Sequence, residues 1–280
     1  MKNTMNSQDL ERFAAYLRRE EKSAGTVENY LRDAARFIAF FAEREELTKE
    51  DVAAWRDTLA AEGGYAACSV NRMVAAVNAL LRFLGMDGLC VKALRVQRRA
   101  FRDRSRELTR EEYERLLEAA SDNPRLYLLL ETLAGVGIRV GETEYITVEA
   151  AQAGRAEIRL KGKVRTILLP AKLCRKLLKY ARKNKIASGA IFRTRSGRPM
   201  SRRQIWAEMK ALCEKAGVEK SKVFPHNLRH LFARMFYKVT RDIVKLSDVL
   251  GHSSIETTRV YLISTGEEHE KVLDRLGLVS

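Results

Sequence analysis

The stretch PHNLRHLFARMFYKVTRDIVKLSDVLGHSSIETTRVYL, residues 225–262, decides the fold of the C-terminal half of this chain. Apolar residues recur in it at helical spacing, and Gly251 interrupts the pattern. We therefore expect helices over residues 226–239, 242–250 and 255–262. Two histidine motifs and a tyrosine lie in the same stretch, so these candidate catalytic groups should lie on the helices or between them.

The sequence before this stretch predicts more helices and one small sheet. In LTREEYERLLEAA, Thr109 is a good N-cap and Glu112 stands at the capping-box position of a helix. In the run AEIRLKGKVRTILLP, apolar and polar residues alternate with a period of two, which indicates two short strands around a turn at residues 161–163. Further helices are expected over 124–136, from about Val140, over 172–185, 201–216 and 267–276.

Residues 7–84 show four amphipathic segments typical of helices, separated by glycine or polar breaks. Residues 92–106 break the pattern, with seven basic residues and a single acid, Asp103. Such a like-charge run is typical of a linker or an interaction arm. We therefore expect an N-terminal helical domain at 1–91, a basic linker at 92–106 and a mixed α and β domain at 107–280.

The charge of the chain favours a polyanionic partner. Lys and Arg number 52 against 36 Asp and Glu, a formal net charge of +16 over 280 residues. This surplus favours encounter with nucleic acid. No apolar run approaches the ~20 residues of a membrane span, and the first residues show no secretory pattern. The four cysteines form no CxxC motif, so we expect a reduced, cytoplasmic protein without membrane association.

Four motifs in the second half carry groups suited to phosphodiester chemistry. They are GIRVGE at 137–142, KGK at 161–163, HNLRH at 226–230, and LGH at 250–252 with Tyr261 nine residues after its histidine. Guanidinium groups neutralise phosphate oxygens, lysine can protonate a leaving oxygen, and histidine can assist a nucleophile. A tyrosine with a pKa near ~10 needs a strongly electropositive pocket to act as that nucleophile.

In this order and spacing, the motifs resemble those of the tyrosine recombinase, or phage-integrase, family and especially its small Xer-like members. The resemblance covers nearly the whole chain and is strongest from residue 108 to 262. It implies that Glu142 supports an arginine on the phosphate and that Lys161 is the general acid. The full catalytic set it implies is Arg139, Lys161, His226, Arg229, His252 and Tyr261.

The resemblance also implies a fold and an activity. An N-terminal four-helix, SAM-like core-binding domain and an α+β catalytic domain would close on DNA as a clamp. Tyr261 would form a 3′-phosphotyrosine bond with DNA, and strand exchange through a Holliday junction would follow without metal, ATP or other cofactor. Four copies would assemble around two double-stranded recombination sites, each C-terminal tail packing on a neighbour.

Basic residues outside the catalytic set are expected to contact DNA phosphates, which attract Lys and Arg regardless of base sequence. They lie in the linker, in the hairpin and at the start of the helix at 201–216: Arg98, Arg99, Arg102, Lys163, Arg165, Arg202 and Arg203.

Several alternatives stay open from the sequence. The hairpin has one residue fewer between its lysines than is usual in the family, so Lys163 competes with Lys161 as the acid. A DNA-binding protein that no longer cuts, or a type IB-like topoisomerase, would share much of the pattern. His226 and His230 lie four residues apart, but no HExxH motif or third ligand accompanies them, and no metal is expected. The tail could also pack on its own domain.

Overall fold

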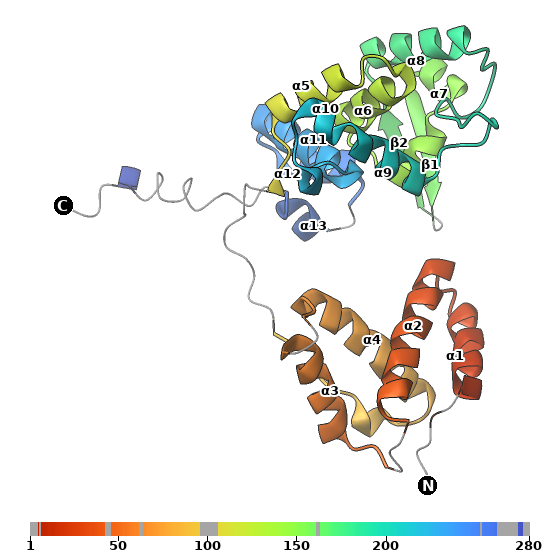
Figure 1. The fold of residues 1–280 in the computed structure, drawn as a ribbon, viewed down its shortest axis with the longest axis vertical. Coiled ribbons are helices and arrows are strands. Elements are labelled where there is room, and N and C mark those ends of the chain that lie inside the picture. Colours follow the sequence, from red (N-terminus) through yellow and green to blue (C-terminus); the bar gives the residue numbers. More distant parts are fainter. Residues whose placement is uncertain are drawn as a thin grey trace. The chain divides into compact units, whose positions relative to one another are not determined.

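The structure is a computed structural model that describes residues 5, 7–42, 46–61, 64–95, 106–160, 163–252, 254–261 and 274–276. The chain divides into two compact units, Met1–Arg98 and Arg99–Ser280 (Figure 1). We call them the N-terminal and C-terminal units. Within the described ranges, no helix is long and apolar enough to cross a membrane.

The N-terminal unit contains the four helices that the sequence predicts. Apolar side chains from all four helices pack together, and Trp55 lies buried against Phe37 with their rings edge to face. On α4, Asn71 and Asn78 each exchange two hydrogen bonds with the main chain of the segment that leaves the unit. The elements are α1 (Ser7–Arg19), α2 (Ala24–Phe40), α3 (Lys49–Ala61), α4 (Ala67–Phe83) and the short 3-10 helix η1 (Asp87–Leu89).

The C-terminal unit is mainly helical, and its described residues form one two-stranded sheet. Thr109 and Glu112 make the predicted capping box at the start of α5. The elements are α5 (Arg110–Ala119), α6 (Pro124–Val136), η3 (Val140–Tyr145), α7 (Val148–Ala153), β1 (Arg155–Leu160), β2 (Lys163–Leu168), α8 (Ala171–Lys183), α9 (Arg202–Ala211), α10 (Cys213–Ala216), η4 (Lys220–Lys222), α11 (Pro225–Thr240), α12 (Ile243–Leu250) and α13 (Ile255–Arg259).

The hairpin β1–β2 is antiparallel, with Leu160 opposite Lys163 at its far end. Along β2 the exposed Val164 and Leu168 alternate with Arg165 and the buried Ile167, because successive side chains of a strand point to opposite faces. Arg165 therefore lies on the face of β2 that is turned toward the core.

Three predicted elements differ in detail. The single helix expected over 201–216 is two helices, α9 and α10, that meet at Leu212. The short helix from Val140 is a 3-10 helix, whose tighter turns suit a six-residue segment. Of the expected tail helix, only residues 274–276 are described, and they are helical; the remainder of that prediction lies outside the described residues.

Candidate active site

Arg139 stands at the solvent-exposed edge of the site, supported by a buried carboxylate. It lies between α6, which ends at Gly137 with a left-handed residue, and η3. Glu142 is buried and accepts a hydrogen bond from the Arg139 main-chain N–H at 2.7 Å and another from its Nη1 at 3.0 Å. The Arg139 side chain keeps 47% of its surface exposed. The carboxylate thus orients the guanidinium group while leaving part of it accessible to an anion.

Arg229 is the buried cation of the site, only 1% exposed on α11. Its Nη1 donates to the Gly137 carbonyl at 2.6 Å, and its Nη2 donates to the Leu250 carbonyl at 2.8 Å. Burial lowers the pKa of Arg229 despite a hydrogen bond to the Tyr261 side chain that raises it. Arg229 therefore joins the end of α6 and the end of α12, and lies beside the phenol oxygen.

His252 is held as a neutral imidazole of defined tautomer. Its Nε2 lies 2.9 Å from Arg229 Nη2, and its Nδ1 lies 2.8 Å from Thr258 Oγ1. A guanidinium group can only donate, so Nε2 accepts and the proton is assigned to Nδ1, which donates to Thr258. Burial, followed by the charges of Arg229, Arg139 and Arg165, lowers the pKa of His252 to about 4.

Tyr261 lies among three imidazole rings. Its ring centroid is 4.3 Å from that of His230, 5.6 Å from His252 and 5.8 Å from His226. Tyr261 is only 5% exposed, although its sequence neighbours at 257–259 are polar. One of those neighbours, Thr258, is itself buried and bonded to His252, so the segment turns inward.

Arg165 joins Arg139 and Arg229 in the same cluster. Its Nη2 donates to Glu142 Oε2 at 2.8 Å, and its Nη1 donates to the Leu250 carbonyl. Gly251 ends α12 at a φ of 63°, and a Cβ there would overlap the Arg165 side chain. The turn after α12 and strand β2 are therefore packed directly against each other.

We expect Gly251→Ala to destabilise the protein more than Gly217→Ala. Both glycines end helices at similar positive φ, which costs alanine about 1–2 kcal/mol. Only Gly251 also faces Arg165, whereas nothing lies within 4 Å of a Cβ at Gly217. Displacing the buried guanidinium should add about 1–3 kcal/mol. Urea unfolding of both variants measures the difference, and equal losses would contradict the described packing.

The depressed pKa of His252 predicts a pH dependence of stability. Between pH 4 and 6.5 the unfolded chain binds a proton that the folded imidazole resists, so the unfolding free energy should rise with pH across this window. Burial of the ring is the largest cause of this low pKa, followed by the charges of Arg229, Arg139, Arg165 and His226. His252→Gln should flatten the dependence, whereas His226→Gln should retain most of it, because burial and the three arginines still lower the pKa of His252. The unfolding free energy measured at pH 5 and pH 7 tests this prediction. If it rises with pH as steeply in His252→Gln as in the wild-type protein, the prediction is wrong.

Not every predicted residue can be placed. The structure brings together Arg139, Glu142, His226, Arg229, His252 and Tyr261, and it adds Arg165. Arg202, at the start of α9, packs over Gly141, where a Cβ would overlap its guanidinium group, and Arg203 is exposed on the same helix. Arg98, Arg99, Arg102 and Lys161 lie outside the described residues, as does the side chain of Lys163.

Sequence reasoning missed the acceptors that organise the cluster. The carbonyls of Gly137 and Leu250 fix Arg229, and the Thr258 hydroxyl fixes His252. The sequence does not show which main-chain carbonyls bind Arg229, because every residue has a carbonyl. The glycines that follow helices α6 and α12 were the available signal, since each marks a helix end where carbonyls lack partners within the helix.

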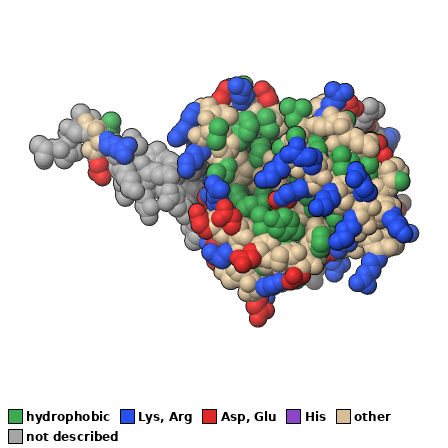
Figure 2. All heavy atoms as spheres, turned by 90° about the horizontal axis from the view of Figure 1, so that it is seen from above, with side chains coloured by type: hydrophobic (Ala, Val, Ile, Leu, Met, Phe, Trp, Pro, Cys, Tyr) green, Lys and Arg blue, Asp and Glu red, His purple; other side chains and the backbone are tan. Residues whose placement is uncertain are grey.

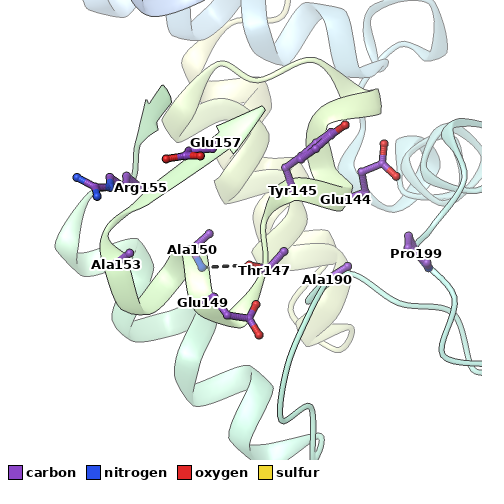
Figure 3. Close-up of a pocket in the computed structure, with 10 residues that line it drawn as sticks. All are labelled: Glu144, Tyr145, Thr147, Glu149, Ala150, Ala153, Arg155, Glu157, Ala190 and Pro199. Carbon is purple, nitrogen blue, oxygen red and sulfur yellow. Dashed lines mark hydrogen bonds between the residues drawn. The ribbon is translucent and has the colours of Figure 1, made fainter. Parts of the chain in front are cut away.

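A separate pocket of about 630 Å³ lies at α7, β1 and the loop before α9 (Figure 3). Three carboxylates, Glu144, Glu149 and Glu157, line it, and the Thr147 hydroxyl there accepts the Ala150 N–H. Carboxylates repel a phosphate backbone, so this pocket is a poor DNA site. In the described part of the chain, no cluster of three or more His, Cys, Asp or Glu is arranged to hold a metal ion.

On the face shown in Figure 2, charge alone does not single out a DNA-binding patch. Lys and Arg side chains are spread over the face shown in Figure 2, with apolar side chains exposed between them. The cluster around Arg229 is distinguished instead by burial, shared acceptors and a tyrosine within it.

Comparison with known proteins identifies the family of the chain. The Phage integrase family matches residues 106–268, and the family of phage integrase N-terminal SAM-like domains matches residues 10–88. Tyrosine recombinase XerA of Pyrococcus furiosus is 30% identical to this chain, across 99% of the chain and 96% of the relative.

Two solved structures share the fold. The XerH recombinase in a post-cleavage complex with difH DNA has a TM-score of 0.76 at 18% identity, over 96% of this chain and 84% of that one. A lambda integrase tetramer bound to a Holliday junction has a TM-score of 0.72 at 20% identity, over 92% of this chain and 78% of that one. The chain belongs to the phage integrase family and is a tyrosine-type site-specific recombinase with an N-terminal SAM-like domain.

Proposed function

We propose that Tyr261 is the nucleophile of this recombinase and that it acts within the site of its own chain. The observation that carries the proposal is the position of its ring, between three imidazoles and beside the Arg229 guanidinium group. A phenol is a weak nucleophile unless positive charge stabilises its oxyanion. Arg229 supplies this charge in a buried setting, where it is screened little by solvent.

The reaction forms a bond between the phenolic oxygen and phosphorus and breaks the bond from phosphorus to the 5′-oxygen. The phenolic proton leaves with assistance from a neighbouring histidine, for which the exposed His226 is well placed. Arg139 and Arg229 neutralise the charge that develops on the non-bridging oxygens, an effect that gives enzymes much of their rate. Lys161 or Lys163 protonates the departing 5′-oxygen.

The covalent intermediate makes the reaction reversible. The 3′-phosphotyrosine bond conserves the energy of the cleaved phosphodiester, so a 5′-hydroxyl from another DNA strand can displace Tyr261 without ATP. The arginines and the lysine supply the positive charge that a metal ion would otherwise provide, so the proposed step needs no cofactor.

DNA binding must also change the position of Tyr261. The ring is 5% exposed, and it follows the five-residue helix α13. We expect the segment of residues 254–261 to shift when a phosphate enters between Arg139 and Arg229, which exposes the phenolic oxygen to phosphorus.

The same proposal covers the rest of the chain. Residues 1–91 bind the core of the DNA site, residues 92–106 form the linker, and residues 107–280 form the catalytic domain. Arg98, Arg99 and Arg102 in the linker, and Arg202 and Arg203 on α9, contact phosphates. Four copies assemble on two recombination sites, as lambda integrase does on a Holliday junction.

A covalent selection from random DNA tests the proposed function. The full chain is incubated with a library of randomised duplexes that carry single nicks, which trap the intermediate because the cleaved fragment diffuses away. DNA that remains attached to protein under denaturing conditions is amplified and sequenced. We expect one inverted-repeat sequence to be enriched and to support strand exchange between two duplexes. Failure to attach any DNA would contradict the proposal, and relaxation of supercoiled DNA without sequence preference would favour a topoisomerase.

A further inference from the structure

Arg165 occupies a position in β2 that normally holds an apolar side chain. It shares the inward face of the strand with the buried Ile167, and its own side chain is only 15% exposed. A guanidinium group in such a position is costly unless acceptors surround it. Its presence there indicates a specific task inside the protein.

The acceptors of Arg165 are groups that also hold the two catalytic arginines. Glu142, which Arg165 contacts at 2.8 Å, also binds Arg139 at 3.0 Å. The Leu250 carbonyl, which accepts from Arg165, also accepts from Arg229 at 2.8 Å. Arg165 thus connects the carboxylate that binds Arg139 to the carbonyl that binds Arg229.

We infer that Arg165 is a positioning residue, which ties the β1–β2 hairpin to Glu142 and to the Leu250 carbonyl and so keeps both catalytic arginines and the hairpin in one arrangement. Strand β2 starts at Lys163, two residues before Arg165, so the tie lies near the start of this strand. The inference rests on the proposed roles of Arg139, Arg229 and Tyr261.

The sequence suggested a DNA contact for Arg165, and its surroundings favour the positioning role. Both terminal nitrogens are engaged with the protein, and Nε is buried with no hydrogen-bond partner in the described part of the chain. Burial lowers the pKa of Arg165, and Arg229 and Arg139 lower it further, against the opposing effect of Glu142. The aliphatic part of the side chain also packs on Gly251, beside His252.

Arg165→Met tests the inference by separating binding from cleavage. The probe is the nicked duplex recovered from the randomised library. We expect the rate of adduct formation to fall about 100-fold, because a misplacement of about 1 Å is sufficient for such a loss. The dissociation constant should stay within about threefold, and the dependence of affinity on salt should not change, because no phosphate contact is lost.

A DNA contact would give the opposite pattern. Affinity would weaken and the slope of log affinity against log salt would fall by about one, which would overturn the inference. Arg155→Met is the matched control, because Arg155 is an exposed arginine at the start of β1 in the same hairpin. It should cleave at the wild-type rate.

A double-mutant cycle separates positioning from a general effect on folding. If Arg165 acts in part through Glu142, Arg165→Met in a Glu142→Gln background should slow cleavage by well under the ~100-fold expected in the wild-type background, since one of its two ties is already lost. Independent, multiplicative effects would overturn the inference. Arg165→Lys keeps the charge but cannot reach both acceptors, so the variant should fold and should still form the adduct slowly. Adduct formation at the wild-type rate by this variant would also overturn the inference.

The proposed function and this inference fail in different ways. If the wild-type protein forms no adduct with any library member, the proposed role of Tyr261 is wrong, and the inference falls with it. If the wild-type protein reacts and Arg165→Met reacts equally fast, only the inference is wrong.

Discussion

We expect Tyr261→Phe to form no covalent adduct with DNA and to bind the selected duplex within about twofold of the wild-type affinity. Phenylalanine preserves the ring that packs against His230 and stacks on His252, but it lacks the attacking oxygen. The loss of cleavage should therefore be complete while the fold is retained. Denaturing gels of the nicked duplex measure the adduct, and fluorescence anisotropy measures the affinity.

The control for this substitution is Tyr180→Phe. Tyr180 lies half-buried on α8 and has no contact with the arginine cluster among the interactions described. Its replacement should leave adduct formation unchanged. An adduct that persists in Tyr261→Phe would show that another residue is the nucleophile.

Arg229→Lys has the second-largest expected effect, and it lowers both activity and stability. Lysine cannot donate to the Gly137 and Leu250 carbonyls and to His252 at the same time, so buried acceptors lose their partner. We expect cleavage to fall about 10²–10³-fold, as when an enzyme loses a preorganised donor to a developing negative charge. The unfolding free energy should fall by about 2–4 kcal/mol.

Single-turnover adduct formation and urea unfolding measure these two effects. Arg175→Lys, at an exposed position on α8, is the matched control and should change neither quantity. If Arg229→Lys cleaves as fast as the wild-type protein, the bidentate geometry at Arg229 has no catalytic importance.

Much of the fold could be predicted from the sequence, because local patterns determine most of it. The four N-terminal helices follow from apolar spacing, and α5 follows from the capping box at Thr109. The division of 201–216 into two helices was missed because no glycine or proline marks Leu212, where the break occurs.

The members of the candidate site could be proposed from the sequence, but their geometry could not. Motif order identified Arg139, Arg229 and Tyr261, which the structure brings together from distant parts of the sequence. Arg165 was expected to face DNA because it is charged, whereas the alternation along β2 places it inward with Ile167. The burial of Tyr261 could not be predicted from its polar neighbours, because it depends on contacts with α11, which is remote in sequence.

Identification of the DNA-linked amino acid tests the central claim most directly. The trapped complex is digested with trypsin and nuclease, and the modified peptide is fragmented in a mass spectrometer. The account predicts a nucleotide on residues 260–271, attached at Tyr261 through the 3′-phosphate of the cleaved strand. Attachment at Ser264, at any other residue, or through a 5′-phosphate would contradict it.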